Sequence, residues 1–203
     1  MRLKSVTAVL ALFAATSPFA IHADGDPEAG KQKAQLCAAC HGPDGNSVNA
    51  AWPSLAGQGP EYLRKQLMDF RAQTRNNDQM SPMGANLSDD DIADLAAYFS
   101  SQTAKIGAAD PTKVEKGARL YRAGNASSGL PACMACHGPT GAGNPAAGYP
   151  ALGGQHADYS VLQLKAFKSE QRANDNKAVM RSIASKMTNA DIRAVASYIQ
   201  GLH

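Results

Sequence analysis

Two short segments of the chain combine cysteines with a histidine at the same spacing. Residues 37–45 read CAACHGPDG and residues 133–141 read CMACHGPTG. Each segment places two thiols on either side of two residues, with an imidazole directly after the second thiol. Such a set can form a disulfide or redox dithiol, contribute to a zinc site, or attach haem c covalently.

The surroundings of the two motifs favour haem attachment. A thioredoxin-like dithiol lies beside a βαβ pattern, and no strand pattern is visible. Zinc takes four ligands, whereas each motif offers three, although pooling both motifs would complete one zinc site. In haem c the two thiols bind the vinyl groups and the following histidine ligates the iron. Zinc and redox thiols remain alternatives. We expect two haem c groups, with these residues as covalent and axial ligands: Cys37, Cys40 and His41 in the first motif, and Cys133, Cys136 and His137 in the second.

The first 23 residues have the pattern of a secretory signal peptide. Arg2 and Lys4 precede an apolar stretch over residues 6–20, and small residues ending at Ala23 offer a cleavage site. The apolar stretch is too short for a lasting membrane span. Export would place the mature chain in an oxidising compartment.

The two motifs belong to a longer internal repeat. Residues 53–58 read PSLAGQ and residues 150–155 read PALGGQ. Tyrosine, glutamine, phenylalanine and asparagine residues then recur at matching positions of both halves. We therefore expect a cleaved signal peptide over residues 1–23 and two tandem domains, residues 24–108 and 109–203.

Helical periodicity dominates both halves. Ser88 and Thr188 are N-cap candidates, each followed three positions later by an aspartate and then by apolar residues at helical spacing. Long loops rich in glycine and proline, together with few aromatic residues, leave each domain a thin core that a buried cofactor would complete. The expected fold class is all-α. Further helices are expected over residues 27–38, 62–70, 113–123 and 159–167.

The iron of each haem needs a second axial ligand. A methionine thioether favours electron transfer, whereas an open position favours ligand binding or catalysis. When the two halves are aligned on Ser88 and Thr188, Met80 and Met180 each lie eight residues before the cap, and no other methionines coincide. We expect Met80 and Met180 to ligate iron from the loop before the last helix of each half. Met83 is the alternative to Met80.

Charge is distributed unevenly between the halves. Residues 24–110 contain 12 acidic and 7 basic residues, whereas residues 111–203 contain 5 acidic and 11 basic residues. Such an asymmetry orients a protein toward charged protein partners, unless it reflects two unrelated solvated surfaces. No nucleic-acid partner is expected.

Beyond these motifs, the chain resembles the cytochrome c4 family of di-haem cytochromes. The resemblance covers the mature sequence and includes Trp52–Gln58, Tyr149–Gln155 and the segments AYFSSQ and SYIQGLH that close the two halves. It implies two tandem class I cytochrome c-type domains, each wrapped around one covalently bound haem with histidine and methionine ligands. It also implies a periplasmic electron carrier in a respiratory chain, not an enzyme.

The resemblance also implies partners and supporting residues. The donor would be a quinol-oxidising cytochrome complex and the acceptor a haem–copper terminal oxidase, with peripheral membrane association left open. In class I cytochromes a proline carbonyl orients the ligating histidine. Pro53 and Pro150 lie 12 and 13 residues after His41 and His137, although both prolines suit loop punctuation equally. A di-haem peroxidase and a haem subunit of a dehydrogenase complex are the alternative functions.

Overall fold

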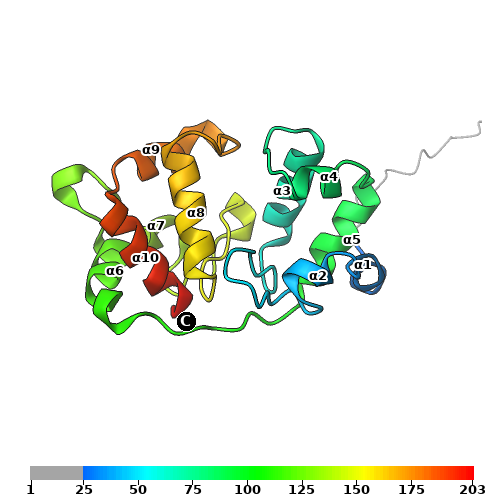
Figure 1. The fold of residues 1–203 in the computed structure, drawn as a ribbon, viewed down its shortest axis with the longest axis horizontal. Helices are drawn as coiled ribbons and strands as arrows, with labels where there is room; N and C mark the ends of the chain where they lie inside the picture. Colours follow the sequence, from blue (N-terminus) through cyan, green and yellow to red (C-terminus); the bar gives the residue numbers. More distant parts are fainter. Residues whose placement is uncertain (1–24) are drawn as a thin grey trace, which may run out of the picture.

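The computed structural model describes residues 25–203, which form two helical lobes (Figure 1). The expected all-α class is confirmed, because extended pairing in the described part is limited to two isolated bridges, Asn125 with Leu130 and Asn144 with Tyr149. A long segment joins the lobes along one side of the molecule. The expected signal peptide lies outside the described residues.

The N-terminal lobe is built around the packing of its first and last helices. Helix α1 packs against α5, and α3 packs against both α4 and α5. The helix expected over residues 27–38 is instead two elements, because four turn residues follow Lys33 before a single helical turn carries the motif. The helices of this lobe are α1 (Pro27–Lys33), α2 (Ala38–His41), α3 (Pro60–Arg71), α4 (Met80–Gly84) and α5 (Asp89–Ser100).

The C-terminal lobe repeats this plan. Helix α6 packs against α10, and α8 packs against both α9 and α10. Its elements are α6 (Pro111–Ala123), α7 (Met134–His137), α8 (Ala157–Lys168), α9 (Val179–Ser185) and α10 (Asn189–Gln200), with 3₁₀ turns η1 (Ala126–Ser128), η2 (Pro145–Ala147) and η3 (Asn176–Ala178).

A glycine permits the close crossing of the terminal helices in each lobe. A β-carbon on Gly30 of α1 would lie 2.0 Å from the carbonyl oxygen of Asp94 on α5. One on Gly117 of α6 would lie 2.4 Å from the carbonyl oxygen of Ala194 on α10. Side chains larger than hydrogen would therefore push each helix pair apart.

The expected N-caps of the last helices are confirmed. The Ser88 hydroxyl accepts from the Asp91 amide at 3.1 Å, and the Asp91 carboxylate accepts from the Ser88 amide at 3.0 Å. Thr188 and Asp191 form the same capping box at the start of α10. These reciprocal bonds satisfy amides that would otherwise have no partner at a helix N-terminus.

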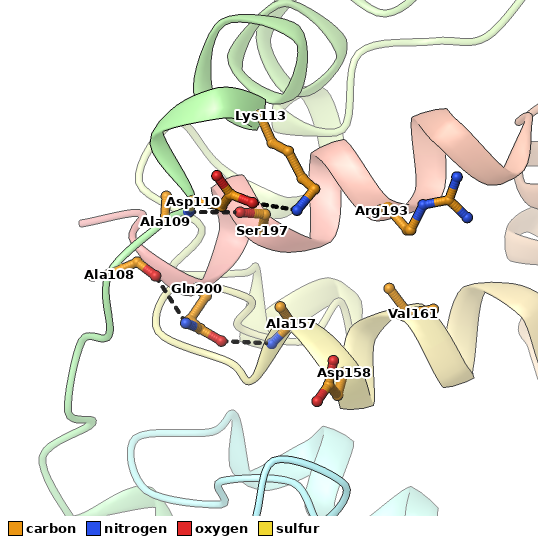
Figure 2. Close-up of a pocket in the computed structure, with 10 residues that line it drawn as sticks. All are labelled: Ala108, Ala109, Asp110, Lys113, Ala157, Asp158, Val161, Arg193, Ser197 and Gln200. Atoms are coloured by element: carbon orange, nitrogen blue, oxygen red, sulfur yellow. Dashed lines mark hydrogen bonds and ion pairs between the residues drawn. The ribbon is translucent and has the colours of Figure 1, made fainter.

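The last residues of the segment between the lobes (residues 101–110) are held against the end of α10. The Gly107 amide donates to the Gln200 carbonyl at 3.0 Å, and the Asp110 amide donates to the Ser197 hydroxyl at 2.9 Å. The side chain of Gln200 donates to the Ala108 carbonyl at 2.8 Å (Figure 2). The end of the connecting segment therefore lies on the C-terminal lobe, whereas Thr103 and Lys105 bond to Asn46 of the N-terminal lobe. A domain boundary between residues 108 and 109 stays a prediction.

No helix within residues 25–203 combines the length and apolar character needed to cross a lipid bilayer.

Candidate functional sites

Each CxxCH motif forms a single helical turn. In α2 the amide of His41 donates to the carbonyl of Cys37 at 2.9 Å, which closes the turn. Residues at positions i, i+3 and i+4 share one side of a helix, so Cys37, Cys40 and His41 lie together. Gly42, with φ of 79°, then carries the chain out of the turn in a conformation that favours glycine.

The second motif repeats this geometry. In α7 the amide of His137 donates to the carbonyl of Cys133 at 3.0 Å, and Gly138 follows with φ of 80°. All four motif cysteines are free thiols and half-buried. Each motif therefore presents two thiols and an imidazole on one side of a short, rigid turn.

A proline carbonyl lies beside each buried motif histidine. His41 Nδ1 lies 2.8 Å from the Pro53 carbonyl oxygen, and His137 Nδ1 lies 2.9 Å from that of Pro150. Because a carbonyl can only accept, Nδ1 must carry the ring proton in each contact. The Nε2 atom of a neutral ring is then left with a lone pair for a metal ion.

Burial changes the protonation chemistry of the motif side chains. It lowers the pKa of His41 and of His137, although the hydrogen bonds to Pro53 and Pro150 act in the opposite direction. It raises the pKa of the Cys133 thiol to about 11. The imidazoles are therefore neutral at pH 7, and Cys133 lacks the lowered pKa of a redox-active thiol.

Met80 begins the short helix α4, so the expected position in a loop is wrong. Its amide donates to the Asn77 side chain at 2.9 Å, and that side chain also accepts from the Gln79 amide. These bonds make Asn77 a local start signal for α4. The side chain of Met80 is half-buried. Figure 1 shows α4 and α2 on different sides of the N-terminal lobe.

Met180 likewise lies in a helix, α9, instead of a loop. Lys177 and Ala178 precede α9 with φ of 52° and 56°, a left-handed conformation that costs a non-glycine residue about 1 kcal/mol. The Asp175 carboxylate accepts from both the amide and the guanidinium of Arg181, at 3.0 and 2.7 Å. This carboxylate fixes the start of α9 and with it the half-buried Met180.

The remaining methionines lie in different environments. Met187 is only 2 % exposed and belongs to the C-terminal core. Met68 and Met83 are about two-fifths exposed, at 41 % and 39 %. Met83 lies in α4 with Met80, so the backbone alone does not decide between them.

Two arginines and two glutamines link the lobes through their side chains. Arg75 donates to Gln66 of its own lobe at 2.8 Å and to Gln163 of the other lobe at 3.0 Å. Arg172 mirrors it, donating to Gln163 at 2.8 Å and to Gln66 at 3.0 Å. Arg172 also donates to the Tyr62 hydroxyl at 3.0 Å and is 8 % exposed. The repeat is therefore also an approximate symmetry of the interface.

A surface hollow, drawn in Figure 2, has no residue of either motif in its lining. It is bounded by the connecting segment, the start of α8 and the end of α10. The lining includes Asp110 paired with Lys113, and Gln200 bonded to the Ala157 amide at 2.9 Å. No cysteine, histidine or methionine lines it, so it is not a candidate cofactor site.

The motif residues fit haem c better than the alternatives. Within residues 25–203 no group of three or more His, Cys, Asp and Glu side chains is arranged to hold a bare metal ion. The pooled zinc site is therefore not formed in the described part. Two free thiols beside an imidazole with its Nδ1 engaged are the donor set that covalent haem requires.

Comparisons with known proteins agree with this donor set. A model of the cytochrome c family matches residues 27–103 and 114–203. Cytochrome c4 of Azotobacter vinelandii is 52 % identical over 90 % of this chain and 91 % of the relative. The crystal structure of reduced recombinant cytochrome c4 from Pseudomonas stutzeri matches with a TM-score of 0.86 at 48 % identity, over 88 % of this chain and 100 % of that chain.

The chain belongs to the cytochrome c4 family. As a cytochrome c4 it has two cytochrome c domains and two haem c groups, and it is an electron carrier, not an enzyme. The peroxidase alternative is therefore wrong. A further relative is the thiosulfate dehydrogenase electron acceptor of Stutzerimonas stutzeri, 41 % identical over 81 % of this chain and 78 % of the relative.

Sequence reasoning missed the residues of this cytochrome c4 that join its domains. Gln58 and Gln155 close the repeated PSLAGQ and PALGGQ segments, and both bond to backbone groups of the opposite lobe. Arg75 and Arg172 occupy equivalent places after the phenylalanine of each repeat. These glutamines and arginines recur in both halves of the sequence outside the CxxCH motifs. That recurrence could have indicated a role common to both domains.

Proposed function

We propose that this cytochrome c4 is a periplasmic electron carrier of a respiratory chain. Each haem is held by one CxxCH motif and one methionine. The covalent ligands are Cys37 and Cys40 in one domain and Cys133 and Cys136 in the other. The axial ligands are His41 with Met80 and His137 with Met180. Pro53 and Pro150 orient the two histidines.

One observation supports this assignment most directly: both lobes repeat the same set of donor groups. The histidine–proline contacts measure 2.8 and 2.9 Å in the two lobes. The methionines recur at one distance from the capping residues Ser88 and Thr188. A molecule with two matching closed sites suits electron transfer, in which both axial ligands stay bound.

The protein's own part in the reaction is to hold geometry. When bound, haem c supplies a one-electron couple. The cysteine thioethers fix the position of each group, and the proline carbonyl keeps each imidazole in one orientation and tautomer. No side chain has to give or take a proton from a substrate. Each site can therefore keep the same ligands in both oxidation states.

The proposed route runs from a quinol-oxidising cytochrome complex to a haem–copper terminal oxidase. The signal-peptide pattern supports the periplasm as the compartment in which these partners meet. The oppositely charged halves support partners that approach different ends of the molecule.

A second route has a specific observation in its favour. A relative of 41 % identity is named for accepting electrons from thiosulfate dehydrogenase. In that route the donor would be a soluble dehydrogenase instead of a quinol-oxidising complex. The haem chemistry of the two routes is the same, so only the donor distinguishes them.

Haem stoichiometry and a ligand variant test the assignment. Intact mass and a pyridine haemochrome spectrum should show two covalent haems per mature chain. His137→Ala should remove the low-spin spectrum of one haem, whereas His203→Ala, at the exposed C-terminus, should leave both. One haem per chain, or two unchanged low-spin haems in His137→Ala, would contradict the proposal.

The donor is tested by comparing reduction rates. The oxidised protein is mixed in turn with a quinol-oxidising complex and with thiosulfate dehydrogenase plus thiosulfate. Fast reduction by the first supports the respiratory route, and fast reduction by the second alone supports the thiosulfate route. Oxidation by a haem–copper oxidase is then followed in the same way.

A further inference from the structure

The peptide group that orients His41 is held by the opposite domain. Its carbonyl, that of Pro53, accepts from His41 Nδ1 at 2.8 Å. Its N–H, that of Ser54, donates to the side-chain oxygen of Gln155 at 3.0 Å. The Gln155 amide nitrogen returns a bond to the Ser54 carbonyl at 2.9 Å. Gln155 therefore bonds to both backbone groups of Ser54, the residue after the proline whose carbonyl accepts from His41.

The same arrangement recurs in the other direction. The Pro150 carbonyl accepts from His137 Nδ1 at 2.9 Å, and the N–H of the same peptide, that of Ala151, donates to Gln58 at 2.8 Å. Gln58 donates back to the Ala151 carbonyl at 3.0 Å. Each domain therefore supplies the clamp for the other domain's histidine.

Each glutamine side chain is also held by a hydrogen bond within its own lobe. The Gln58 oxygen also accepts from the Gly59 amide at 2.9 Å, and the Gln155 oxygen accepts from the His156 amide at 3.0 Å. Gln58 is 7 % exposed and Gln155 is half-buried. The two side chains line the same narrow hollow between the domains. Bonds at a buried and preorganised place are the ones whose loss is most costly.

We propose that Gln58 and Gln155 are positioning residues that act crosswise, each setting the hydrogen bond of the axial histidine in the opposite domain. The inference rests on the proposed ligation of iron by His41 and His137. In each direction a series of hydrogen bonds runs from the glutamine side-chain amide through the peptide group to the imidazole that would ligate the iron.

The physical effect follows from polarisation along this chain. A peptide whose N–H donates to a good acceptor has a more negative carbonyl oxygen, because hydrogen bonds in a chain strengthen one another. A stronger acceptor at Nδ1 raises the basicity of the ligating imidazole. A more basic ligand stabilises the oxidised iron. Each glutamine therefore lowers the reduction potential of the haem in the other domain.

Amide hydrogen exchange tests the geometry directly in the unmodified, reduced holoprotein. The amides of Ser54 and Ala151 lie in loops but should exchange slowly, because each donates to the side-chain oxygen of a glutamine. Gln58→Leu, which keeps the volume and removes both bonds, should accelerate exchange at Ala151 about tenfold. Gln155→Leu should do the same at Ser54. Unprotected amides in the unmodified protein would overturn the proposal without any variant.

Reduction potentials test the crosswise effect. The two potentials are measured by spectroelectrochemistry and assigned to domains by NMR contacts between each haem and its own motif. Gln58→Leu should raise the potential of the C-terminal haem, and Gln155→Leu that of the N-terminal haem. A shift in the variant's own domain, or an equal shift in both, would overturn the proposal.

Tyr62→Phe is the matched control. It removes a different bond across the interface, the one between the Tyr62 hydroxyl and Arg172, without touching either histidine's peptide. It should leave the exchange of Ser54 and Ala151 and both potentials unchanged. An equal shift in this control would mean that general loosening of the interface explains the result. Faster exchange in Gln58→Leu with both potentials unchanged would reject the coupling, whereas two low-spin haems in His137→Ala would reject the ligation on which it rests.

Discussion

At the scale of single residues, hydrogen bonds determine which ring nitrogen of each proposed iron-ligating histidine carries the proton. The Pro53 and Pro150 carbonyls can only accept, so they place the ring proton on Nδ1 of His41 and His137. Burial keeps those rings neutral by lowering their pKa. Met80 and Met180 are positioned through the backbone of α4 and α9, and their assignment as iron ligands rests on the repeat.

Replacing a distal methionine should open one iron and leave the other unchanged. Met180→Ala should remove half of the weak far-red absorption that oxidised, methionine-ligated haem shows. It should also lower one reduction potential and let the reduced protein bind one carbon monoxide per chain, because the thioether raises the potential and closes the site. Met80→Ala should affect the other haem in the same way.

Met83→Ala is the control for the N-terminal site. Met83 lies in the same helix as Met80 and is 39 % exposed, so its loss should change neither absorption nor potential. If Met83→Ala removes the band and Met80→Ala does not, the ligand assignment in this domain is reversed.

At the scale of helices, local devices fix where the site residues lie. The motif turns end at Gly42 and Gly138, and the last helix of each domain starts at a capping box. In the C-terminal domain Lys116 of α6 also pairs with Asp191 of α10 at 2.8 Å. This ion pair joins the cap to the crossing of the two terminal helices.

The stability of the C-terminal domain should depend on the charge of Asp191. Burial alone would raise its pKa, but hydrogen bonds from Lys116 and Thr188 hold that pKa at about 2. Because an unfolded aspartate titrates near 3.9, the folded state gains stability above that pH and loses it as the pH falls toward 2. Asp191→Asn should lower the free energy of unfolding by about 1–2 kcal/mol at pH 7.

Denaturant titrations of the holoprotein between pH 7 and pH 3 check this dependence. The difference between the natural protein and Asp191→Asn should narrow below pH 4. Asp90→Asn in α5 is the control, because Asp90 is exposed and makes no ion pair within the described residues, and it should cost about 0.5 kcal/mol or less. A difference that stays constant with pH would show that the carboxylate charge contributes nothing.

At the scale of the molecule, two lobes of opposite charge meet at a polar interface. The arginine and glutamine contacts are repeated in both directions, which suits a fixed relation between the domains. Most acidic residues at the start of α5 are already paired: Asp89 with Arg71, and Asp91 and Asp94 with Lys33. Their reversal would disturb packing as well as charge.

Reversing one charge that has no ion-pair partner in each domain should affect different redox partners. Asp90 and Lys165 are exposed and make no ion pair within residues 25–203. At low ionic strength, Asp90→Lys should slow the reaction with one redox partner and Lys165→Glu the reaction with the other, each roughly two- to fivefold. The effects should fade as salt screens the charges. Stopped-flow rates across a salt series measure both, and equal effects on both partners would contradict a directional role.

Much of the local structure followed from the sequence, because its causes lie within a few residues. The spacing of Cys37, Cys40 and His41 restricted the chemistry, and the caps at Ser88 and Thr188 were predicted from side chains three positions apart. The repeat selected Met80 and Met180. The helical state of α4 and α9 was missed, although the side-chain bonds from Asn77 and Asp175 at their starts are also local.

The contacts between the domains were decided only by the tertiary structure. Gln58 bonds to a residue 93 positions away and Gln155 to one 101 positions away. No local propensity specifies such a contact, since it depends on how two separately folded lobes are placed. The repeated glutamines were visible in the sequence, but their role follows from an interface that brings each one to the other domain's histidine.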